Sequence, residues 1–146
     1  MVVAAVTSDD LDGLRSVRRA CRCDVTAGEY AFGLTDVHRL LAEHAVDCLQ
    51  LDVTRCGGYT VWRDAVGVAR AHHVEVSGHC APSLTVPVAA GDPAVRHTEW
   101  FRDHVRVETA LFDPPPTPVD GALVPASGPG HGLTLRTADA DGYRVA

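Results

Sequence analysis

Four ionisable side chains recur in the first hundred residues at intervals that fit a repeating structural unit. They are Glu29, Asp52, His79 and Glu99, and each follows the one before it by roughly 20 to 27 residues. Each also stands at the end of a short strand-like run, and the interval matches one strand–turn–helix unit. In a parallel α/β barrel, the carboxyl ends of the strands form the face on which active sites are built. We therefore expect the four side chains to line one rim in chain order.

Each of these residues also has a purely structural explanation. Glu29 follows a glycine and suits a loop carboxylate, and Asp52 can cap the turn after its strand. His79, between a glycine and a cysteine, is typical of a hydrogen-bonded structural histidine. Glu99 can be a solvated edge residue. The joint pattern favours a function, because chance seldom places ionisable residues at four consecutive strand ends.

The elements expected to position these residues alternate along the chain. Helices are predicted after a cap at Ser8, after Gly33 or Thr35, over about Thr60–His72 and near Ser83–Ala90. The strands are predicted near residues 2–6, 24–28, 46–52, 74–78 and 97–101, parallel and joined by right-handed crossovers. Four or five such βα units form part of a TIM-type barrel, because a closed barrel needs eight units in about 250 residues. A small doubly wound α/β sheet is the structural alternative.

The composition changes at residue 113. A run of three prolines and the glycine-rich stretch Gly128–Gly132 predict an extended C-terminal tail. Short strands are possible there at Leu123 and at Leu133–Leu135. The expected organisation is a partial barrel over residues 1–112 and a tail over residues 113–146.

Composition excludes several classes of function. The chain has 146 residues, 46% of them hydrophobic and 22% charged, which is ordinary for a globular domain. Its net charge of −6 and scattered arginines do not favour nucleic-acid binding. It lacks a membrane-spanning apolar run and the pattern of a secretory signal, so we expect a cytoplasmic protein. All 13 basic residues are arginine, so no lysine can act as a base or form a Schiff base. The five cysteines include no CxxC pair and are expected to be free thiols.

Longer stretches around the four residues resemble one family. They are Ala27–Tyr30 (AGEY), Leu51–Gly58 (LDVTRCGG), Ser77–Pro82 (SGHCAP) and His97–Phe101 (HTEWF). In the tail, Leu111–Asp113, Val119–Gly121 and Pro129–Leu133 add to the likeness. Together these motifs resemble the C-terminal barrel portion of the mandelate racemase/muconate lactonizing enzyme family, in the enolase superfamily. The resemblance extends from about Val6 to Arg136.

The resemblance implies a reaction and a role for each residue. Members of the family bind a carboxylate substrate on Mg²⁺ and remove the proton from the adjacent carbon, as acid-sugar dehydratases or as racemases. By this likeness His79 is the base and Asp52 is the aspartate that orients it. Glu99 bonds the substrate carboxylate, and Glu29 is a ligand of the Mg²⁺ ion. Dehydratases and racemases share the first proton abstraction, so these residues fit both reactions.

The resemblance also implies which features family members carry outside the region that this sequence matches. A capping domain and the first strands precede the region in family members, and they supply specificity, a second base and two more acidic ligands. The tail packs back toward that capping domain. The position of the second ligand corresponds to Val3-Ala4-Ala5, which is aliphatic. One carboxylate does not hold Mg²⁺ firmly, so we expect the isolated chain to be inactive.

Two other classes of function stay open at this point. The first is a non-catalytic half-barrel that pairs through its open edge with a second copy or with another chain that completes the barrel. The second is an unrelated small α/β domain whose rim of acids is fortuitous.

Overall fold

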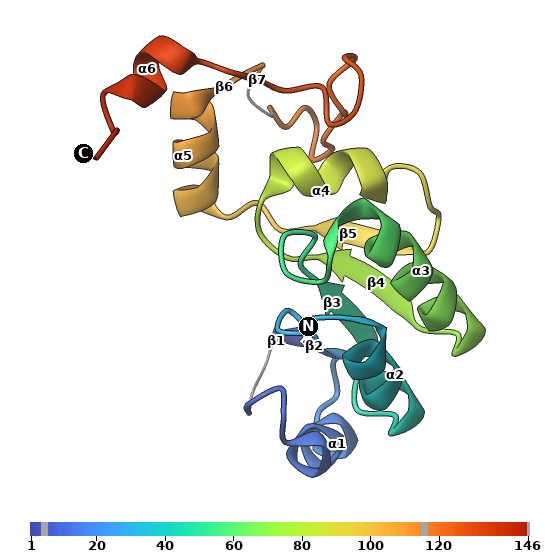
Figure 1. The fold of residues 1–146 in the computed structure, drawn as a ribbon. Coiled ribbons are helices and arrows are strands. Elements are labelled where there is room, and N and C mark those ends of the chain that lie inside the picture. The colour runs from blue at the N-terminus through green and yellow to red at the C-terminus, as the bar shows by residue number, and fades with distance from the viewer. Residues whose placement is uncertain (4–5, 115–116, 146) are drawn as a thin grey trace.

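The structure, a computed structural model, describes residues 1–3, 6–114 and 117–145. Its main sheet has five parallel strands in the order β1-β2-β3-β4-β5. The strands are β1 (Val2–Val3), β2 (Val25–Ala27), β3 (Cys48–Leu51), β4 (Glu75–Gly78) and β5 (Val95–Thr98). Between them lie α1 (Leu11–Ala20), α2 (Leu34–Ala42), α3 (Gly58–Ala71) and α4 (Pro82–Ala89) (Figure 1). The predicted parallel βα units are confirmed. A doubly wound sheet reverses its strand order at a switch point, and the five described strands show no reversal, so that alternative is wrong.

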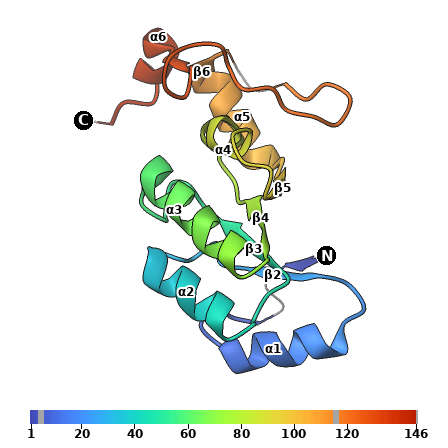
Figure 2. The same ribbon diagram turned by 90° about the vertical axis from the view of Figure 1, so that its right-hand side faces the viewer.

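One face of the sheet is apolar and is covered by helices. Val25, Ala27, Leu49, Leu51 and Val76 are buried on it, and Figure 2 shows α2 and α3 on one side of the strands. The helices contribute a matching set of buried side chains: Leu14, Val37, Leu40, Leu41, Trp62, Ala65, Val66 and Ala69. This face is therefore the outer side of a barrel wall, with its helical layer in place.

The opposite face carries buried polar side chains and is curved inward. Thr26, Gln50 and Ser77 are fully buried on it, as expected for alternate residues of a strand. Arg96 of β5 donates a hydrogen bond of 2.6 Å to Asp24, which directly precedes β2. In a flat sheet, strands three positions apart are separated by roughly 14 Å, which is too far for this contact. The ion pair therefore shows that the sheet curls with its polar face inside.

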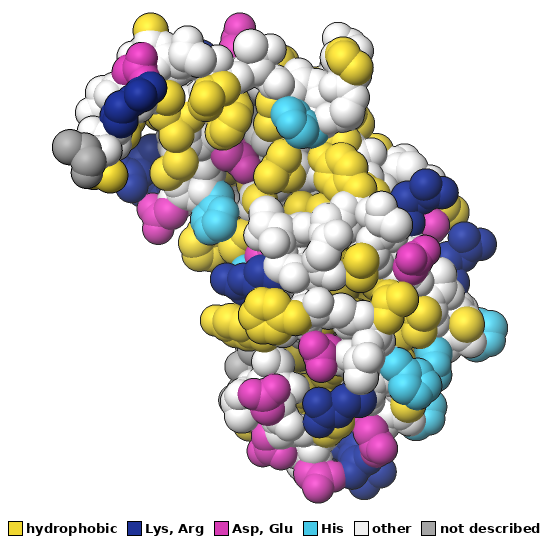
Figure 3. Space-filling view, viewed as in Figure 1, with side chains coloured by type: hydrophobic (Ala, Val, Ile, Leu, Met, Phe, Trp, Pro, Cys, Tyr) yellow, Lys and Arg dark blue, Asp and Glu magenta, His cyan; other side chains and the backbone are white. Residues whose placement is uncertain are grey.

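The surface in Figure 3 shows a group of histidine side chains on the lower right flank of the molecule. His38 of α2 and His72, which directly follows α3, meet edge to face with ring centroids 6.4 Å apart. The two helices are thus neighbours on the outside of the sheet. No described helix has the length and apolar character needed to cross a membrane.

Several predicted boundaries need correction. The predicted cap of α1 at Ser8 is wrong, because the side chain of Asp10 caps the helix by accepting from the Gly13 amide at 2.8 Å. The fifth strand lies at 95–98 rather than at 97–101. A register shift between Val76 and Ser77 accommodates Arg96 as an extra residue in β5. Because this residue is charged, the sequence shows no apolar run at the start of the strand.

The region after β5 holds helices that the sequence pattern did not predict. Helix α5 (Arg102–Leu111) follows the rim, and the short helix α6 (Thr137–Asp141) lies within the predicted extended tail. Strand β6 (Phe112–Asp113) pairs in antiparallel fashion with β7 (Thr134–Leu135), which confirms the strand predicted near Leu133–Leu135. Leu123 lies outside the strands. The predicted family role of the tail, packing toward a capping domain, stays a prediction.

The strand end that carries Glu29 depends on a glycine, which gives a test of the fold. Gly28 has φ +125°, and a Cβ there would lie 2.8 Å from the carbonyl oxygen of Gln50. We expect Gly28→Ala to destabilise the chain by at least about 2 kcal/mol, through backbone strain and this clash. The matched control is Gly67→Ala in α3, where a Cβ meets nothing within 4 Å. It should stabilise by about 0.5–1 kcal/mol. Urea denaturation of both variants checks the pair, and equal effects would contradict it.

Candidate active site

Three of the four predicted residues meet at the strand ends. Asp52 follows β3, His79 follows β4, and Glu99 follows β5. The ladder continues past the strands, with His79 N bonded to the Leu51 carbonyl at 2.8 Å and Glu99 N to the Gly78 carbonyl at 2.9 Å. His79 Nδ1 lies 2.8 Å from Asp52 Oδ2, and His79 Nε2 lies 4.0 Å from Glu99 Oε2. The predicted contact between Asp52 and His79 is present.

The environment of Asp52 holds its carboxyl in the charged form. The residue is 3% exposed, and its Oδ1 accepts from the Thr54 amide at 2.8 Å and the Thr54 hydroxyl at 2.6 Å. Burial by itself would raise the pKa, but the hydrogen bonds from His79 and Thr54 outweigh it and lower the pKa to about 2. A carboxylate at Nδ1 assigns the ring proton to that nitrogen. Nε2 then carries the free lone pair of the neutral imidazole.

Glu99 is fixed by two donors. Gln50 Nε2 donates to its Oε1 at 2.9 Å, and the Cys80 amide donates to its Oε2 at 3.2 Å. Gln50 reaches across β4 from the inner face of β3, which is possible because the sheet is curved. Sequence reasoning missed Gln50. It stands two residues before Asp52 and so faces the same side of the sheet, which is the signal that could have found it.

Cys80 is the second residue that sequence reasoning missed. Its Sγ lies 3.3 Å from His79 Nε2 and 3.9 Å from Glu99 Oε2. Burial and the carboxylates of Glu99 and Asp52 raise the pKa of the Cys80 thiol to about 11, so the thiol is neutral at pH 7. Its backbone φ is +48° and that of Ala81 is +38°. Such strained conformations in non-glycine residues cluster at functional sites.

Helix α5, which was not predicted, braces the loop after His79. His104 Nδ1 accepts from the Ala81 amide at 3.3 Å. Glu108, buried against α4, accepts from the Ser83 hydroxyl at 2.6 Å and the Ser83 amide at 3.2 Å. These bonds hold the strained residues and the start of α4 in place.

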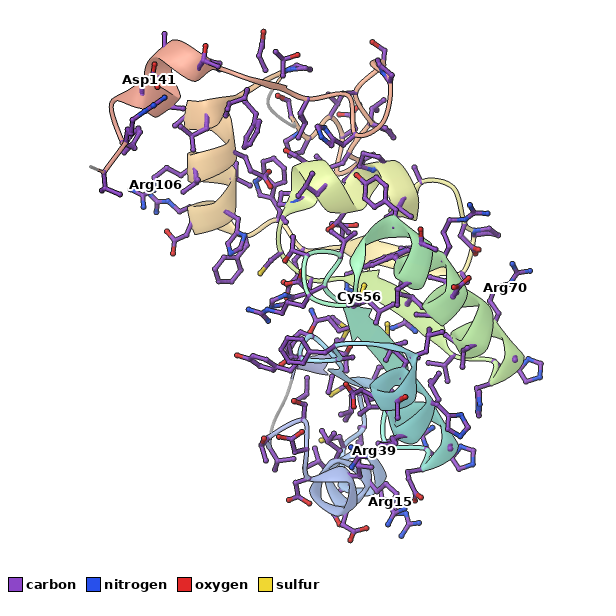
Figure 4. All side chains as sticks on the ribbon, in the orientation of Figure 1. Arg15, Arg39, Cys56, Arg70, Arg106 and Asp141 are labelled. Atoms are coloured by element: carbon purple, nitrogen blue, oxygen red, sulfur yellow. The ribbon has the colours of Figure 1, made fainter. Side chains whose placement is uncertain are left out.

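Glu29 occupies a separate part of the rim, at the end of β2. It is 7% exposed, and its Oε2 accepts from the Gly28 amide at 3.0 Å. Arg55 connects Glu29 to the pair formed by Asp52 and His79. Its Nη1 donates to the Glu29 carbonyl at 3.2 Å, and its Nε lies 3.7 Å from Asp52 Oδ2. Cys56, labelled in Figure 4, lies in the same loop between β3 and α3. Glu29 borders a hollow of about 720 Å³ that is also lined by Thr7, Ser8, Asp9, Asp36 and Arg39.

The donor atoms that gather beside His79 do not fit Mg²⁺. Within the described ranges, one group of three ligating side chains is present, formed by His79, Cys80 and Glu99, and Glu29 is not in it. Mg²⁺ takes oxygen ligands in octahedral geometry, whereas this group offers nitrogen, sulfur and oxygen. Of the predicted second-ligand position, Val3-Ala4-Ala5, the last two residues lie outside the described residues. We therefore derive no step that depends on Mg²⁺ bound by these residues.

Comparison with protein families and curated proteins identifies relatives that match most of the chain. A family model described as enolase C-terminal domain-like matches residues 4–140. A 3,6-anhydro-α-L-galactonate cycloisomerase of Streptomyces coelicolor is 28% identical over 127 residues, or 87% of this chain and 34% of the relative. A D-galactarolactone cycloisomerase of Agrobacterium fabrum is 27% identical over 143 residues, or 89% of this chain and 38% of the relative. The chain thus spans a little over a third of the length of these relatives.

Solved structures show the same fold. A mandelate racemase/muconate lactonizing enzyme-like protein from Rubrobacter xylanophilus superposes with a TM-score of 0.89 at 38% identity, over 96% of this chain and 39% of that one. An enolase from Bradyrhizobium, complexed with magnesium and mandelic acid, superposes with a TM-score of 0.89 at 26% identity, over 99% of this chain and 38% of that one.

The low pKa of Asp52 predicts how stability depends on pH. The carboxyl of the unfolded chain takes up a proton near pH 3.8, whereas the folded one does so near pH 2. The stabilisation, about 2 kcal/mol, is therefore complete above about pH 5 and is lost progressively as the pH falls from about 5 through 2. We expect Asp52→Asn to remove this contribution, so that the stability difference between wild type and variant shrinks across that window. Urea unfolding at a series of pH values measures it, and a constant difference from pH 5 to pH 2 would contradict it.

Proposed function

Because the chain belongs to the enolase C-terminal domain-like family, within the mandelate racemase/muconate lactonizing enzyme group, we propose that its rim carries the base of an α-proton abstraction from a carboxylate substrate. The observation that carries the proposal is the 2.8 Å contact between His79 Nδ1 and Asp52 Oδ2. It leaves Nε2 as the basic atom and keeps a charged carboxylate behind the ring. A histidine held in this way is a typical general base.

The proposed roles are those that the family resemblance implies, and the geometry supports them. His79 Nε2 takes the proton from the carbon next to the substrate carboxylate. The Asp52 carboxylate, buried and ionised, stabilises the imidazolium that forms. Glu99, 4.0 Å from Nε2, hydrogen-bonds the substrate carboxylate where negative charge builds up. The thiol of Cys80 lies 3.3 Å from His79 Nε2, the atom that must reach the substrate's proton. A bound substrate must therefore contact or displace this thiol.

The substrate class and the metal are further parts of the proposal. Two relatives are named as cycloisomerases of sugar-derived acids or lactones, and this supports an acid sugar as the substrate. Glu29 is our candidate for the one carboxylate that the chain contributes to a Mg²⁺ ion, the ion named with the Bradyrhizobium structure. The other ligands would come from residues beyond those that form this rim, so we propose that activity requires a partner segment that completes the barrel.

Exchange of the substrate's α-proton for deuterium in D₂O tests the base. For the chain alone, with Mg²⁺ and a panel of mandelate, galactonate and galactarate, we expect no exchange above that of His79→Asn. The chain alone offers one candidate carboxylate for the ion, which does not hold Mg²⁺ firmly. Without the ion, the reaction loses a charge stabilisation of several kcal/mol, which is worth several powers of ten in rate. Metal-dependent exchange that His79→Asn abolishes would show that the chain is active by itself.

A complemented complex gives the positive arm of the test. The chain is co-expressed with the remaining N-terminal part of the Rubrobacter xylanophilus protein, and complex formation is checked by size. We expect exchange to appear in the complex and to fall by about 10²–10⁴-fold in His79→Asn. The matched control, His38→Asn, changes an exposed histidine of α2 and should leave exchange unchanged. Exchange that survives His79→Asn, or a full-sized complex without exchange on any acid, would contradict the proposal.

A further inference from the structure

Three different donor atoms converge at the ends of β4 and β5. His79 Nε2 and Cys80 Sγ are 3.3 Å apart, Cys80 Sγ and Glu99 Oε2 are 3.9 Å apart, and Glu99 Oε2 and His79 Nε2 are 4.0 Å apart. A tetrahedral zinc ion bonds nitrogen and oxygen at about 2.0–2.2 Å and sulfur at about 2.3 Å. These bond lengths place pairs of ligand atoms roughly 3.3–3.7 Å apart. The three atoms therefore need to move by only a few tenths of an ångström to fit the ion.

The surrounding bonds hold the donor atoms in this arrangement. Asp52 accepts from the far nitrogen of His79, and such a carboxylate behind the ring is the usual support of a metal-bound histidine. Gln50 donates to Glu99 Oε1 at 2.9 Å, and the Cys80 amide donates to Oε2 at 3.2 Å. These bonds hold Oε2 within 3.9 Å of the thiol and 4.0 Å of the imidazole. Cys80 is 5% exposed and has a positive φ, so its thiol is held in the group by the strained loop.

We propose that His79 Nε2, Cys80 Sγ and Glu99 Oε2 form a binding site for a zinc-class divalent cation, with water in the fourth position. Sulfur and imidazole ligands select zinc over magnesium, since magnesium prefers oxygen alone. On binding, the Cys80 S–H bond breaks, its proton passes to water, and the sulfur lone pair forms the bond to the metal. The site exists independently of the proposed reaction. If that reaction is also correct, the metal occupies the lone pair that the base needs, and zinc inhibits it.

Cobalt titration of the full chain under reducing conditions tests the site, because a thiolate bound to Co²⁺ gives a charge-transfer absorption band in the near ultraviolet. The background variant is Cys21→Ser/Cys23→Ser, which removes the two thiols that lie close together elsewhere in the chain. We expect this variant to bind one Co²⁺ per chain with the band, to release it to Zn²⁺, and to keep it in a thousandfold excess of Mg²⁺. Adding Cys80→Ser should abolish the band and weaken Zn²⁺ binding at least tenfold, and Glu99→Gln should weaken binding with the band retained.

A measurement on the wild-type chain covers the case in which a variant fails to fold. X-ray absorption at the zinc edge should show one sulfur neighbour per zinc, at about 2.3 Å. The proposal is overturned by a band that survives Cys80→Ser in a folded variant, by zinc without a sulfur neighbour, or by the absence of zinc and cobalt binding to the wild-type chain. None of these readouts uses enzyme activity, so the zinc site and the proposed proton abstraction can fail separately.

Discussion

The register of five sequential parallel strands is the constraint from which the site follows. Each strand is paired in parallel with the next one in the chain, so the carboxyl ends of neighbouring strands lie about 4.8 Å apart on one rim. A residue directly after β3 and a residue directly after β4 must then be neighbours, as Asp52 and His79 are. Curvature of the sheet adds the third residue, because it lets Gln50 reach past β4 to Glu99. The strand topology therefore brings these residues together, and their side-chain chemistry acts on that arrangement.

The inner face shows what this curvature requires energetically. Buried polar groups are costly unless they are hydrogen-bonded. At the end of the sheet where the strands begin, the polar groups are partly exposed, and Arg96 pairs there with Asp24 and Glu75. At the end where the strands finish, Gln50 donates to Glu99, yet its own Oε1 has no hydrogen-bond partner within the described residues. The buried part of the inner face thus carries the polar side chains of Thr26, Gln50 and Ser77 beside Cys48, in contrast to the helix-covered face. A surface of this kind is suited to water or polar ligands rather than to a dry core.

The sequence predicted the features that depend on local pattern. Apolar runs that end in Asp52 and His79 located two strand ends within a residue, and parallel pairing then implied their contact. It did not predict α5, because the buried residue of that helix is Glu108 rather than an apolar side chain. The apolar period that marks a helix is consequently weak there. The start of β5 was missed for a related reason, since Arg96 forms partly exposed ion pairs with Asp24 and Glu75 of neighbouring segments. Residues that serve long-range polar contacts do not show as a local hydrophobic pattern.

Cys80 shows why the chemistry of the rim needed the structure. Cys80 directly follows His79 in the chain, but adjacent side chains in extended backbone normally point to opposite sides. The sequence therefore offered no reason to expect the thiol beside the imidazole. The positive φ at Cys80 and Ala81 turns the thiol back toward Nε2, and α5 keeps that turn in place through His104 and Glu108. One nitrogen lone pair then faces a thiol, a carboxylate and the approach of any substrate. Proton abstraction requires that lone pair to be free, whereas a soft metal ion would use it as a ligand. The strained loop therefore brings both proposed uses to the same nitrogen atom. Helix α5 helps to hold that loop, although it contributes neither Asp52 nor His79.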